Sequence, residues 1–350
     1  MPRKSVLVTG ANGYIGSAVC RAFVRAGWQV FGLVRRLDAA GGLEADEITP
    51  IVGSLSDLSF LDSLFDHTKT FEVIVGCTEP PDYASHFHEA MAMFRRVAEV
   101  SNSSHVRPLV LWTSGCKDYG TTAVDGDPDL GPHTEVSPLN TPAVLSARAT
   151  YSLKVLEQTD LFDATVLRPT NVFGYSSSYY GVIFEYAAKV VANGAKSLRI
   201  ADVDPRSIMH AMHVDDCAEA YVALAEHGDR AAVFGQCFNI SASEYETAEA
   251  VAEALAREYG LSSGAEFVAG SENSGNPSMA PALLPLLGFS QWVGSDKIRD
   301  VTGWTDRRPL FSQNLSVYRR SYEAAVRAGH EDIARIQGRQ EFIKSALQNQ

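Results

Sequence analysis

A glycine-rich turn between an apolar strand and an amphipathic helix is the feature that most constrains how this chain folds. Residues 5–9, Ser-Val-Leu-Val-Thr, form a short apolar run typical of a strand buried on both faces. The turn that follows reads TGANGYIG from Thr9, and apolar residues then recur at helical spacing up to Gly27. The segment therefore predicts the first strand-turn-helix unit of a parallel sheet.

Each glycine of this turn has a mechanical role that predicts a dinucleotide site. Gly10 permits the tight turn, Gly13 lets the backbone approach a pyrophosphate, and Gly16 lets helix and sheet pack closely. The helix N-terminus adds oriented N–H groups and a partial positive charge. Glycine turns also join many strands and helices without binding anything, so the downstream pattern has to support this interpretation. The expected contacts are Gly10, Asn12, Gly13, Tyr14, Ile15 and Gly16.

Apolar runs alternate with helical patterns along the first part of the chain. Strands are expected at residues 30–34, near Ile51, at 73–75 and at 109–113, with helices between them. Parallel neighbours need crossover connections that carry helices, so the fold class is α/β: a Rossmann-like doubly wound parallel sheet with a smaller C-terminal substrate-binding part. We expect residues 1–172 to form the dinucleotide-binding domain, to which later segments return. Residues 173–350 should form mainly the substrate-binding part and C-terminal helices.

Composition narrows the classes of partner. The 350 residues are 45% hydrophobic, which excludes general disorder, and a net charge of −12 repels nucleic acid and anionic membrane surfaces. No run of 18 consecutive apolar residues predicts a membrane span. The five scattered cysteines lack CxxC spacing, so we expect a reducing, cytoplasmic compartment and neither disulfides nor a metal site. A small molecule is the expected partner, with no nucleic acid or membrane.

Two arginines follow the second strand, in the stretch Leu33-Val34-Arg35-Arg36. An NAD-selective site normally has an Asp or Glu here for the ribose 2′-hydroxyl. A guanidinium instead suits a 2′-phosphate, so Arg35, with Arg36 second, favours NADP as the cofactor, and NAD is the alternative. The other interpretation is a solvated surface pair, one member of which Asp38 neutralises.

Six stretches in a fixed order carry a resemblance to a known family. They are TGANGYIG from Thr9, the strand ending in LVRR, LWTSGCKDYG from Leu111, LRPTNVFG from Leu167, MHVDD from Met212, and DVTGWTDRRPLF near the C-terminus. With these the sequence resembles the extended short-chain dehydrogenase/reductase family, which contains nucleotide-sugar epimerases, dehydratases and dihydroflavonol-reductase-like enzymes. The resemblance spans most of the chain and implies an enzyme that uses a nicotinamide cofactor.

The resemblance also implies a proton-transfer group beside the nicotinamide. In the family a Ser or Thr after the fifth strand works with a Tyr on the next helix, and a Lys follows that Tyr four residues later. The ammonium of the Lys lowers the pKa of the phenol. Here Tyr151 and Lys154 are three residues apart, which still shares a helix face. Tyr151 is then the general acid or base, Lys154 holds the nicotinamide ribose and lowers the pKa of Tyr151, and Ser114 binds the reacting oxygen.

The register of this match is displaced from the family pattern. Aligning Glu157 with the glutamate that usually follows the lysine puts Ala149 and Leu153 in the catalytic positions. Counting back from the Tyr-Gly pair after the fifth strand puts Gly115 at the usual hydroxyl position, with Ser114 just before it. Aligning Lys154 with the family's lysine instead puts Thr150 in place of the tyrosine, so neither register restores the usual pair.

Other positions that match the family pattern imply further cofactor contacts. The family's Gly-Asp-Leu after the third strand is here Gly53-Ser54-Leu55, which keeps hydrogen bonding and loses one charge. Its His-x-Ala-Ala after the fourth strand is replaced by a segment that contains Thr78. The contacts implied are Ser54, Leu55, Thr78, Thr113, Lys154, Pro169, Asn171 and Val172.

The remaining candidates concern the substrate side. The clustered imidazoles and carboxylates of residues 209–216 lack the helical spacing of metal ligands, and in the resembled family this stretch lies at the pocket rim, which makes His213 and Arg206 candidate substrate contacts. Cys116 is expected to pack rather than react. The final amphipathic stretch is expected to pack on the body or to form a homodimer contact through Ile333, Ile336, Phe342, Ile343 and Leu347.

Three functions follow. The first is an NADP(H)-dependent oxidoreductase acting on a carbonyl or secondary alcohol of a small organic molecule. The second is an epimerase or dehydratase that holds its cofactor tightly. The third, suggested by the displaced Tyr and Lys, is a dinucleotide-binding protein with lost or non-redox activity.

Overall fold

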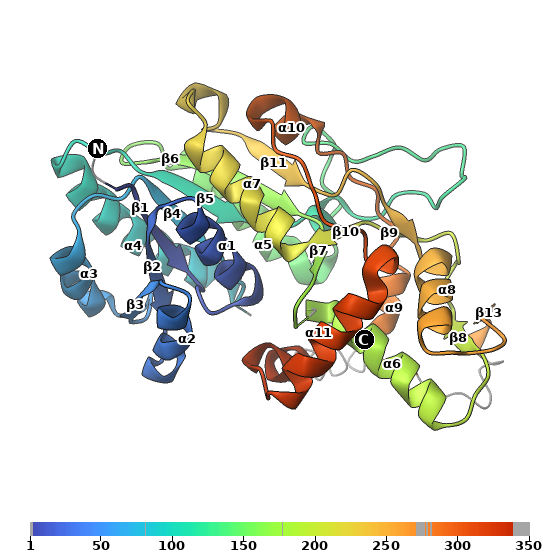
Figure 1. Ribbon diagram of the computed structural model, residues 1–350. Coiled ribbons are helices and arrows are strands. Elements are labelled where there is room, and N and C mark those ends of the chain that lie inside the picture. Colours follow the sequence, from blue (N-terminus) through green and yellow to red (C-terminus); the bar gives the residue numbers. More distant parts are fainter. Residues whose placement is uncertain are drawn as a thin grey trace.

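A seven-stranded parallel sheet lies at the centre of the computed structural model, which describes residues 3–80, 82–176, 178–270, 277, 279–280 and 282–338 (Figure 1). The strand order is β11-β6-β5-β4-β1-β2-β3, and all neighbours run parallel. The strands are β1 (Ser5–Thr9), β2 (Gln29–Val34), β3 (Thr49–Val52), β4 (Val73–Gly76), β5 (Leu109–Thr113), β6 (Asp163–Pro169) and β11 (Cys237–Ile240). The predicted Rossmann-like fold is confirmed.

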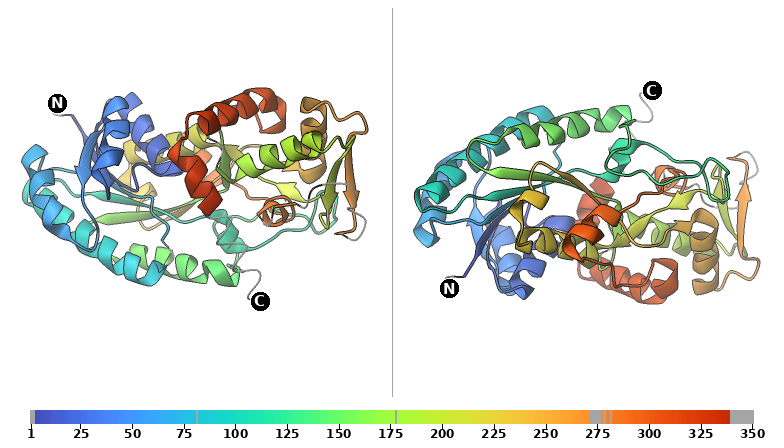
Figure 2. Two further views of the ribbon diagram at one scale, coloured as in Figure 1. Left: turned by 90° about the horizontal axis from the view of Figure 1, so that it is seen from below. Right: turned by 90° about the horizontal axis from the view of Figure 1, so that it is seen from above.

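Helices cover both faces of this sheet, which explains why its strands are apolar throughout. Val6 and Val8 pack into the core beneath α1 and α7, whereas Leu7 between them packs into the core beneath α3 and α4. Figure 2 shows α4 and α5 along one side of the sheet and α1 and α7 on the other. The helices of this lobe are α1 (Tyr14–Arg25), α2 (Ala40–Ala45), α3 (Leu61–His67), α4 (Tyr83–Ser103), α5 (Ser146–Lys154), α7 (Val214–Glu226) and α10 (Asp296–Thr302).

A second apolar core forms the smaller lobe. Side chains of α6, α8, α9 and α11 make up most of it, and three two-stranded sheets, β7 with β10, β9 with β12 and β8 with β13, belong to this part of the molecule. The helices are α6 (Gly181–Ala192), α8 (Ala248–Glu258), α9 (Leu283–Leu287) and α11 (Leu315–Arg327). The strands are β7 (Asn171–Phe173), β8 (Leu198–Ala201), β9 (Ile208–Met209), β10 (Ala211–His213), β12 (Glu246–Thr247) and β13 (Ala265–Val268).

Short 3₁₀ helices connect several of these elements. They are η1 (Leu37–Ala39), η2 (Leu58–Phe60), η3 (Cys116–Tyr119), η4 (Ala143–Leu145), η5 (Val155–Glu157), η6 (Ser178–Tyr180), η7 (Arg230–Ala232) and η9 (Ser312–Asn314).

The chain crosses between the lobes more than once. After β7 it enters the second core, and it returns to the main sheet with α7, β11 and α10. Ile333 and Ile336 pack into the second core, whereas Phe342, Ile343 and Leu347 lie outside the described residues. Within the described ranges, no helix combines the length and apolar character needed to cross a membrane.

Candidate functional site

The glycine turn has a backbone that only glycine satisfies at its two ends. Gly10 lies in the left-handed region with φ of 65°, and a Cβ there would be 2.8 Å from the carbonyl oxygen of Cys77. A Cβ on Gly16 would be 2.1 Å from the carbonyl oxygen of Gly10. The Gly13 amide donates to the same oxygen at 2.8 Å and closes the turn. Helix α1 therefore begins directly against the end of β1.

The first turn of α1 suits an anionic ligand. Gly13 is its N-cap, no side chain of the described ranges caps the helix, and residues 14–17 include no carboxylate. The amides of a first helical turn lack intrahelical partners and carry a partial positive charge, so they fit the diphosphate of a dinucleotide. The Tyr14 hydroxyl donates to the Gly174 carbonyl at 2.6 Å and thereby ties this end of α1 to the loop after β7.

The two arginines after β2 differ in their partners. The Nε of Arg36 lies 2.9 Å from Oδ1 of Asp38, and both side chains are exposed. Arg35 is also exposed and has no ion pair among the described residues. Within the part of the chain that the structure describes, Arg35 is therefore the cation next to the end of β2 that lacks an ion pair.

Residues after β3 and β4 lie near the same edge of the sheet. The Ser54 hydroxyl shares a hydrogen bond of 2.9 Å with Ser56, and Leu55 packs against the core beneath α3. Thr78 lies over the glycine turn, because its methyl carbon would be 2.9 Å from a Cβ on Gly10. Its hydroxyl is 2.6 Å from Nε2 of His86, and burial lowers the pKa of that imidazole to about 4. Thr78 is thus oriented by a neutral histidine.

The predicted contacts on β5, β6 and β7 are more enclosed. The Thr113 hydroxyl is hydrogen-bonded to the Tyr221 hydroxyl of α7 at 2.8 Å. Pro169 is the last residue of β6, Asn171 opens β7, and Val172 packs into the core beneath α1. Cofactor contact at these positions stays a prediction.

Tyr151 and Lys154 come together on the flank of α5 that contacts α4. The Tyr151 ring lies 5.3 Å from the Phe87 ring and 6.0 Å from the His88 ring, and Nζ of Lys154 lies 4.5 Å from the Tyr151 ring centroid. The Tyr151 hydroxyl has no hydrogen bond among the described residues. Because an α-helix turns about 100° per residue, Ala149 projects roughly 200° away from Tyr151. The structure therefore pairs Tyr151 with Lys154, and the Ser114 hydroxyl bonds to Asp118.

Ser114 belongs to a different group of side chains. Its hydroxyl donates to Oδ2 of Asp118 at 2.6 Å, and the Arg148 guanidinium donates to Oδ1 of Asp118 at 2.6 Å. Arg148 also donates to Glu79 at 3.0 Å. Asp118 is completely buried. We name Ser114, Lys117, Asp118, Arg148 and Glu79 the β5 cluster, because it forms around the carboxyl end of that strand.

The β5 cluster surrounds Gly115, which one register places at the hydroxyl position of the family pattern. A Cβ on Gly115 would lie 3.2 Å from Nη2 of Arg148, so the guanidinium occupies the space next to that backbone position. Lys117 lies in the same segment, with Nζ 4.8 Å from the Phe289 ring and no ion pair among the described residues. Burial, and then the neighbouring Arg148, lower the pKa of Lys117 to about 8. Sequence reasoning missed Arg148, Asp118 and Lys117, because their contacts join segments that are far apart in the sequence.

The remaining candidates have defined partners. Nδ1 of His213 accepts from the Asp215 amide at 3.1 Å and so caps α7, and burial lowers the pKa of His213 to about 4. Arg206 pairs with Asp204 on the surface. Sγ of Cys116 donates to the Arg168 carbonyl at 2.8 Å, and burial raises the pKa of this thiol.

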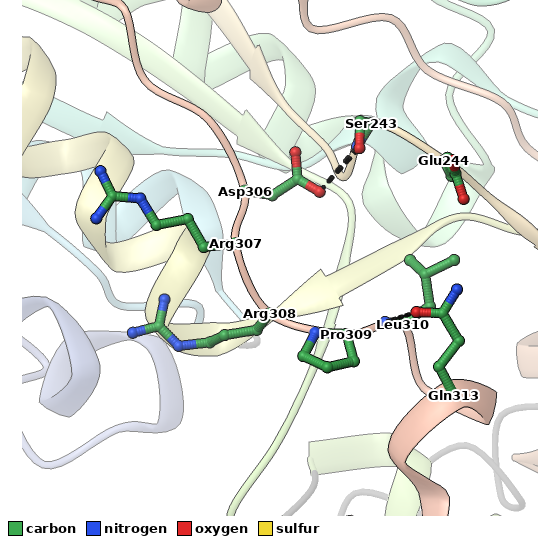
Figure 3. Close-up of a pocket in the computed structure, with 8 residues that line it drawn as sticks. All are labelled: Ser243, Glu244, Asp306, Arg307, Arg308, Pro309, Leu310 and Gln313. Carbon is green, nitrogen blue, oxygen red and sulfur yellow. Dashed lines mark hydrogen bonds between the residues drawn. The ribbon is translucent and has the colours of Figure 1, made fainter.

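An open pocket of about 330 Å³ lies elsewhere, between the segments of residues 243–244 and 306–313 (Figure 3). Asp306 bonds to Ser243 across it, and the Leu310 amide donates to Gln313. None of the predicted cofactor or catalytic residues lines it.

Comparison with known proteins identifies the family. A family model described as the NAD dependent epimerase/dehydratase family matches residues 6–241. UDP-glucuronate 4-epimerase 2 of Arabidopsis thaliana is 31% identical over 131 residues, which are 33% of this chain and 30% of that protein. An uncharacterized protein of Schizosaccharomyces pombe is 46% identical over 56 residues, which are 16% of this chain and 19% of that protein. The chain thus matches only a minor part of the length of these curated relatives.

Solved structures match over far more of the chain. The dTDP-glucose 4,6-dehydratase from Bacillus anthracis in complex with NAD has a TM-score of 0.68 at 18% identity and covers 92% of this chain and 97% of its own. The UDP-glucuronic acid 4-epimerase from Bacillus cereus in complex with NAD has a TM-score of 0.65 at 15% identity, with coverages of 91% and 99%. Likeness at these identities concerns the fold alone.

The parallel sheet and the second lobe define a protein of the Rossmann-fold class that these two solved structures share. Within that class, the chain belongs to the NAD dependent epimerase/dehydratase family.

Proposed function

We propose that this enzyme is an NADP(H)-dependent oxidoreductase acting on a carbonyl or secondary alcohol of a small organic molecule. The cofactor preference is carried by Arg35, an exposed cation with no ion pair among the described residues. Arg35 lies directly after β2, where an NAD-selective site has a carboxylate that binds the ribose 2′-hydroxyl. Arg36 adds less, because Asp38 neutralises it. The nicotinamide, when bound, supplies or accepts the hydride.

The chain's own residues hold the dinucleotide in this proposal. The amides of the glycine turn bind the diphosphate, and the Arg35 guanidinium binds the 2′-phosphate through a planar pair of N–H donors. Ser54 and Leu55 lie toward the adenine, and Thr78 lies beside the turn. Pro169, Asn171 and Val172 line the nicotinamide side.

Two proton-transfer arrangements compete. In the first, Tyr151 is the acid or base, but its ring packs on α4. In the second, Lys117 moves a proton at Nζ to or from the substrate oxygen, because it lies in the segment that follows β5 and its lowered pKa of about 8 leaves both protonation states accessible near neutral pH. Asp118 fixes Arg148 and Ser114 in place beside it.

The cofactor proposal is tested by calorimetric titration of the purified protein with NADPH and NADH. The wild type should bind NADPH more tightly, and Arg35→Ala should weaken NADPH binding about tenfold while leaving NADH binding unchanged. Arg36→Ala is the matched control, because that guanidinium is already paired, and it should change the preference little. Equal affinity of the wild type for both dinucleotides contradicts the NADP assignment.

The second candidate function is an epimerase or dehydratase that retains its cofactor. It is favoured by the matched curated relatives, which include UDP-glucuronate 4-epimerases. Absorbance of the reduced nicotinamide separates the two functions. A reductase changes it in proportion to product, whereas an epimerase forms product at constant absorbance.

A further inference from the structure

The described C-terminal segment returns across the molecule to the glycine turn. Helix α11 ends at Arg327, Gly329 reverses the chain with φ of 64°, and residues 331–338 form a further helical stretch. Ile333 and Ile336 anchor this stretch in the second core, and the Ser176 hydroxyl donates to the buried Asp332 carboxylate at 2.7 Å. Figure 2 shows this dark red segment next to α1. Its position is therefore held by both apolar and polar contacts.

Arg335 is the residue of this segment that meets the turn. Its Nη1 donates to the carbonyl oxygen of Asn12 at 2.5 Å and to Oδ1 of Asp332 at 2.9 Å, and its Nη2 pairs with Glu331. Oε2 of Glu331 in turn accepts a long hydrogen bond of 3.5 Å from the side-chain Nδ2 of Asn12. The Arg335 side chain is 38% exposed, so a ligand in the turn has access to it.

Arg335 offsets the negative charge of this segment, which would otherwise repel an anion at the turn. Asp332 and Glu331 both lie close to the turn, and their carboxylates would repel a diphosphate. Asp332 is fixed by Ser176, whereas the Glu331 side chain is 49% exposed and free to turn into solvent. An arginine fork can bind phosphate oxygens as readily as carboxylate oxygens.

We propose that Arg335 is part of the dinucleotide site, where its guanidinium binds the diphosphate held by the glycine turn and exchanges Glu331 for that ligand. Asp332 keeps its contacts with Ser176 and Arg335 and holds the guanidinium in position. The inference rests on the proposed function, because it assumes that a dinucleotide binds at this turn. It adds a phosphate ligand from the far end of the chain to the main-chain amides.

The experiment is calorimetry on the full-length protein with three probes. NADP⁺ has a diphosphate and a 2′-phosphate, ADP-ribose has only the diphosphate, and 2′-AMP has only the 2′-phosphate. Arg335→Ala should weaken NADP⁺ and ADP-ribose about tenfold each and leave 2′-AMP unchanged. Arg35→Ala should do the reverse, weakening NADP⁺ and 2′-AMP but not ADP-ribose.

Two further variants test the exchange of partners. Glu331→Gln removes the competing carboxylate, so it should tighten ADP-ribose binding by about twofold to fivefold. Arg327→Ala, an exposed arginine at the end of α11, is the matched control and should change no affinity. Thermal melting of each variant checks that it is folded. If Arg335→Ala is unstable, ADP-ribose binding by Glu331→Gln still tests the role of Arg335.

The possible outcomes distinguish a failure of the Arg335 proposal from a failure of the proposed function. A wild-type protein that binds no pyridine dinucleotide overturns the proposed function. Wild-type binding that Arg335→Ala leaves unchanged, or that it tightens, overturns the role of Arg335 alone. With an unstable Arg335→Ala, unchanged ADP-ribose binding by Glu331→Gln overturns it as well.

Discussion

The glycine turn and the β5 cluster both follow strands of the same parallel sheet, and strands β1 and β5 present their carboxyl ends at one edge. The turn is built from main-chain atoms, and its glycines occupy positions where a Cβ would collide with backbone. The β5 cluster is built from side chains, with Arg148 beside the backbone of Gly115. The comparison teaches that one half of the candidate site depends on backbone geometry, whereas the other half depends on contacts between side chains.

The largest expected effect comes from breaking the backbone half. Gly16→Ala places a Cβ 2.1 Å from the Gly10 carbonyl oxygen, so the helix must move away from the strand. We expect dinucleotide binding to be lost in calorimetry and the free energy of unfolding in urea to fall by about 3 kcal/mol.

Gly42→Ala is the control for that substitution. A Cβ at Gly42 in α2 meets nothing within 4 Å, so alanine should be neutral or stabilising by up to about 1 kcal/mol. Retained binding by Gly16→Ala would show that the turn does not hold the dinucleotide.

The next effect tests the side-chain half. Asp118→Asn leaves Arg148 without its buried carboxylate, and breaking one side of a buried pair costs about 3 kcal/mol. Urea unfolding measures this loss. Asp204→Asn breaks the exposed pair with Arg206 and should cost less than about 1 kcal/mol. Equal costs at the two sites would mean that the β5 cluster is not a buried, coupled unit.

A smaller, pH-dependent effect concerns Lys117. Burial lowers its pKa from 10.5 to about 8, so between these values the unfolded chain binds a proton that the folded chain does not. The contribution of Lys117 to stability therefore falls as pH falls from 10.5 to 8 and stays low below that. Lys117→Met removes this penalty.

We expect Lys117→Met to be about 1–2 kcal/mol more stable than the wild type at pH 7 and to lose that advantage near pH 10.5. Unfolding in urea at the two pH values measures the difference. A gain of equal size at both pH values would show that Lys117 titrates normally. A stabilised variant without turnover would indicate that the lysine is kept for chemistry.

The smallest effect is expected for Tyr151→Phe. The ring that packs on Phe87 and His88 is retained, and the lost hydroxyl has no hydrogen bond among the described residues. Stability should change by less than about 0.5 kcal/mol. Turnover, followed as NADPH oxidation with a carbonyl substrate, should persist. Loss of turnover with an unchanged melting temperature would return the acid-base role to Tyr151.

Sequence reasoning reached the fold because the signals were local. Side chains of β1 alternate between the two faces of the sheet, so Val6 and Val8 pack into one core and Leu7 into the other. A short run that is apolar at every position indicates such a buried parallel strand. The spacing of Gly10, Gly13 and Gly16 likewise lies within one turn of chain. Arg35 was a candidate because its place follows directly from the end of β2, and its contact with a cofactor stays a prediction.

The rest of the site depends on contacts that local patterns do not encode. The pairing of Arg148 with Asp118 requires the rotation of α5 about its own axis, and a shift of two residues moves a side chain to the other flank. Arg335 meets Asn12 across 323 positions of sequence. Neither contact has a periodic signature that one sequence reveals.

The order of the central sheet has a consequence for how the protein is made. Strand β6 is paired on one side by β5, but its other neighbour, β11, begins only at Cys237. Ribosomes add roughly 5–20 residues per second, so the open side of β6 waits on the order of ten seconds for its partner during synthesis. Over that interval an apolar strand edge is available to other nascent chains. Truncated or stalled products that end before residue 237 should therefore aggregate, and chaperone supply should govern yield.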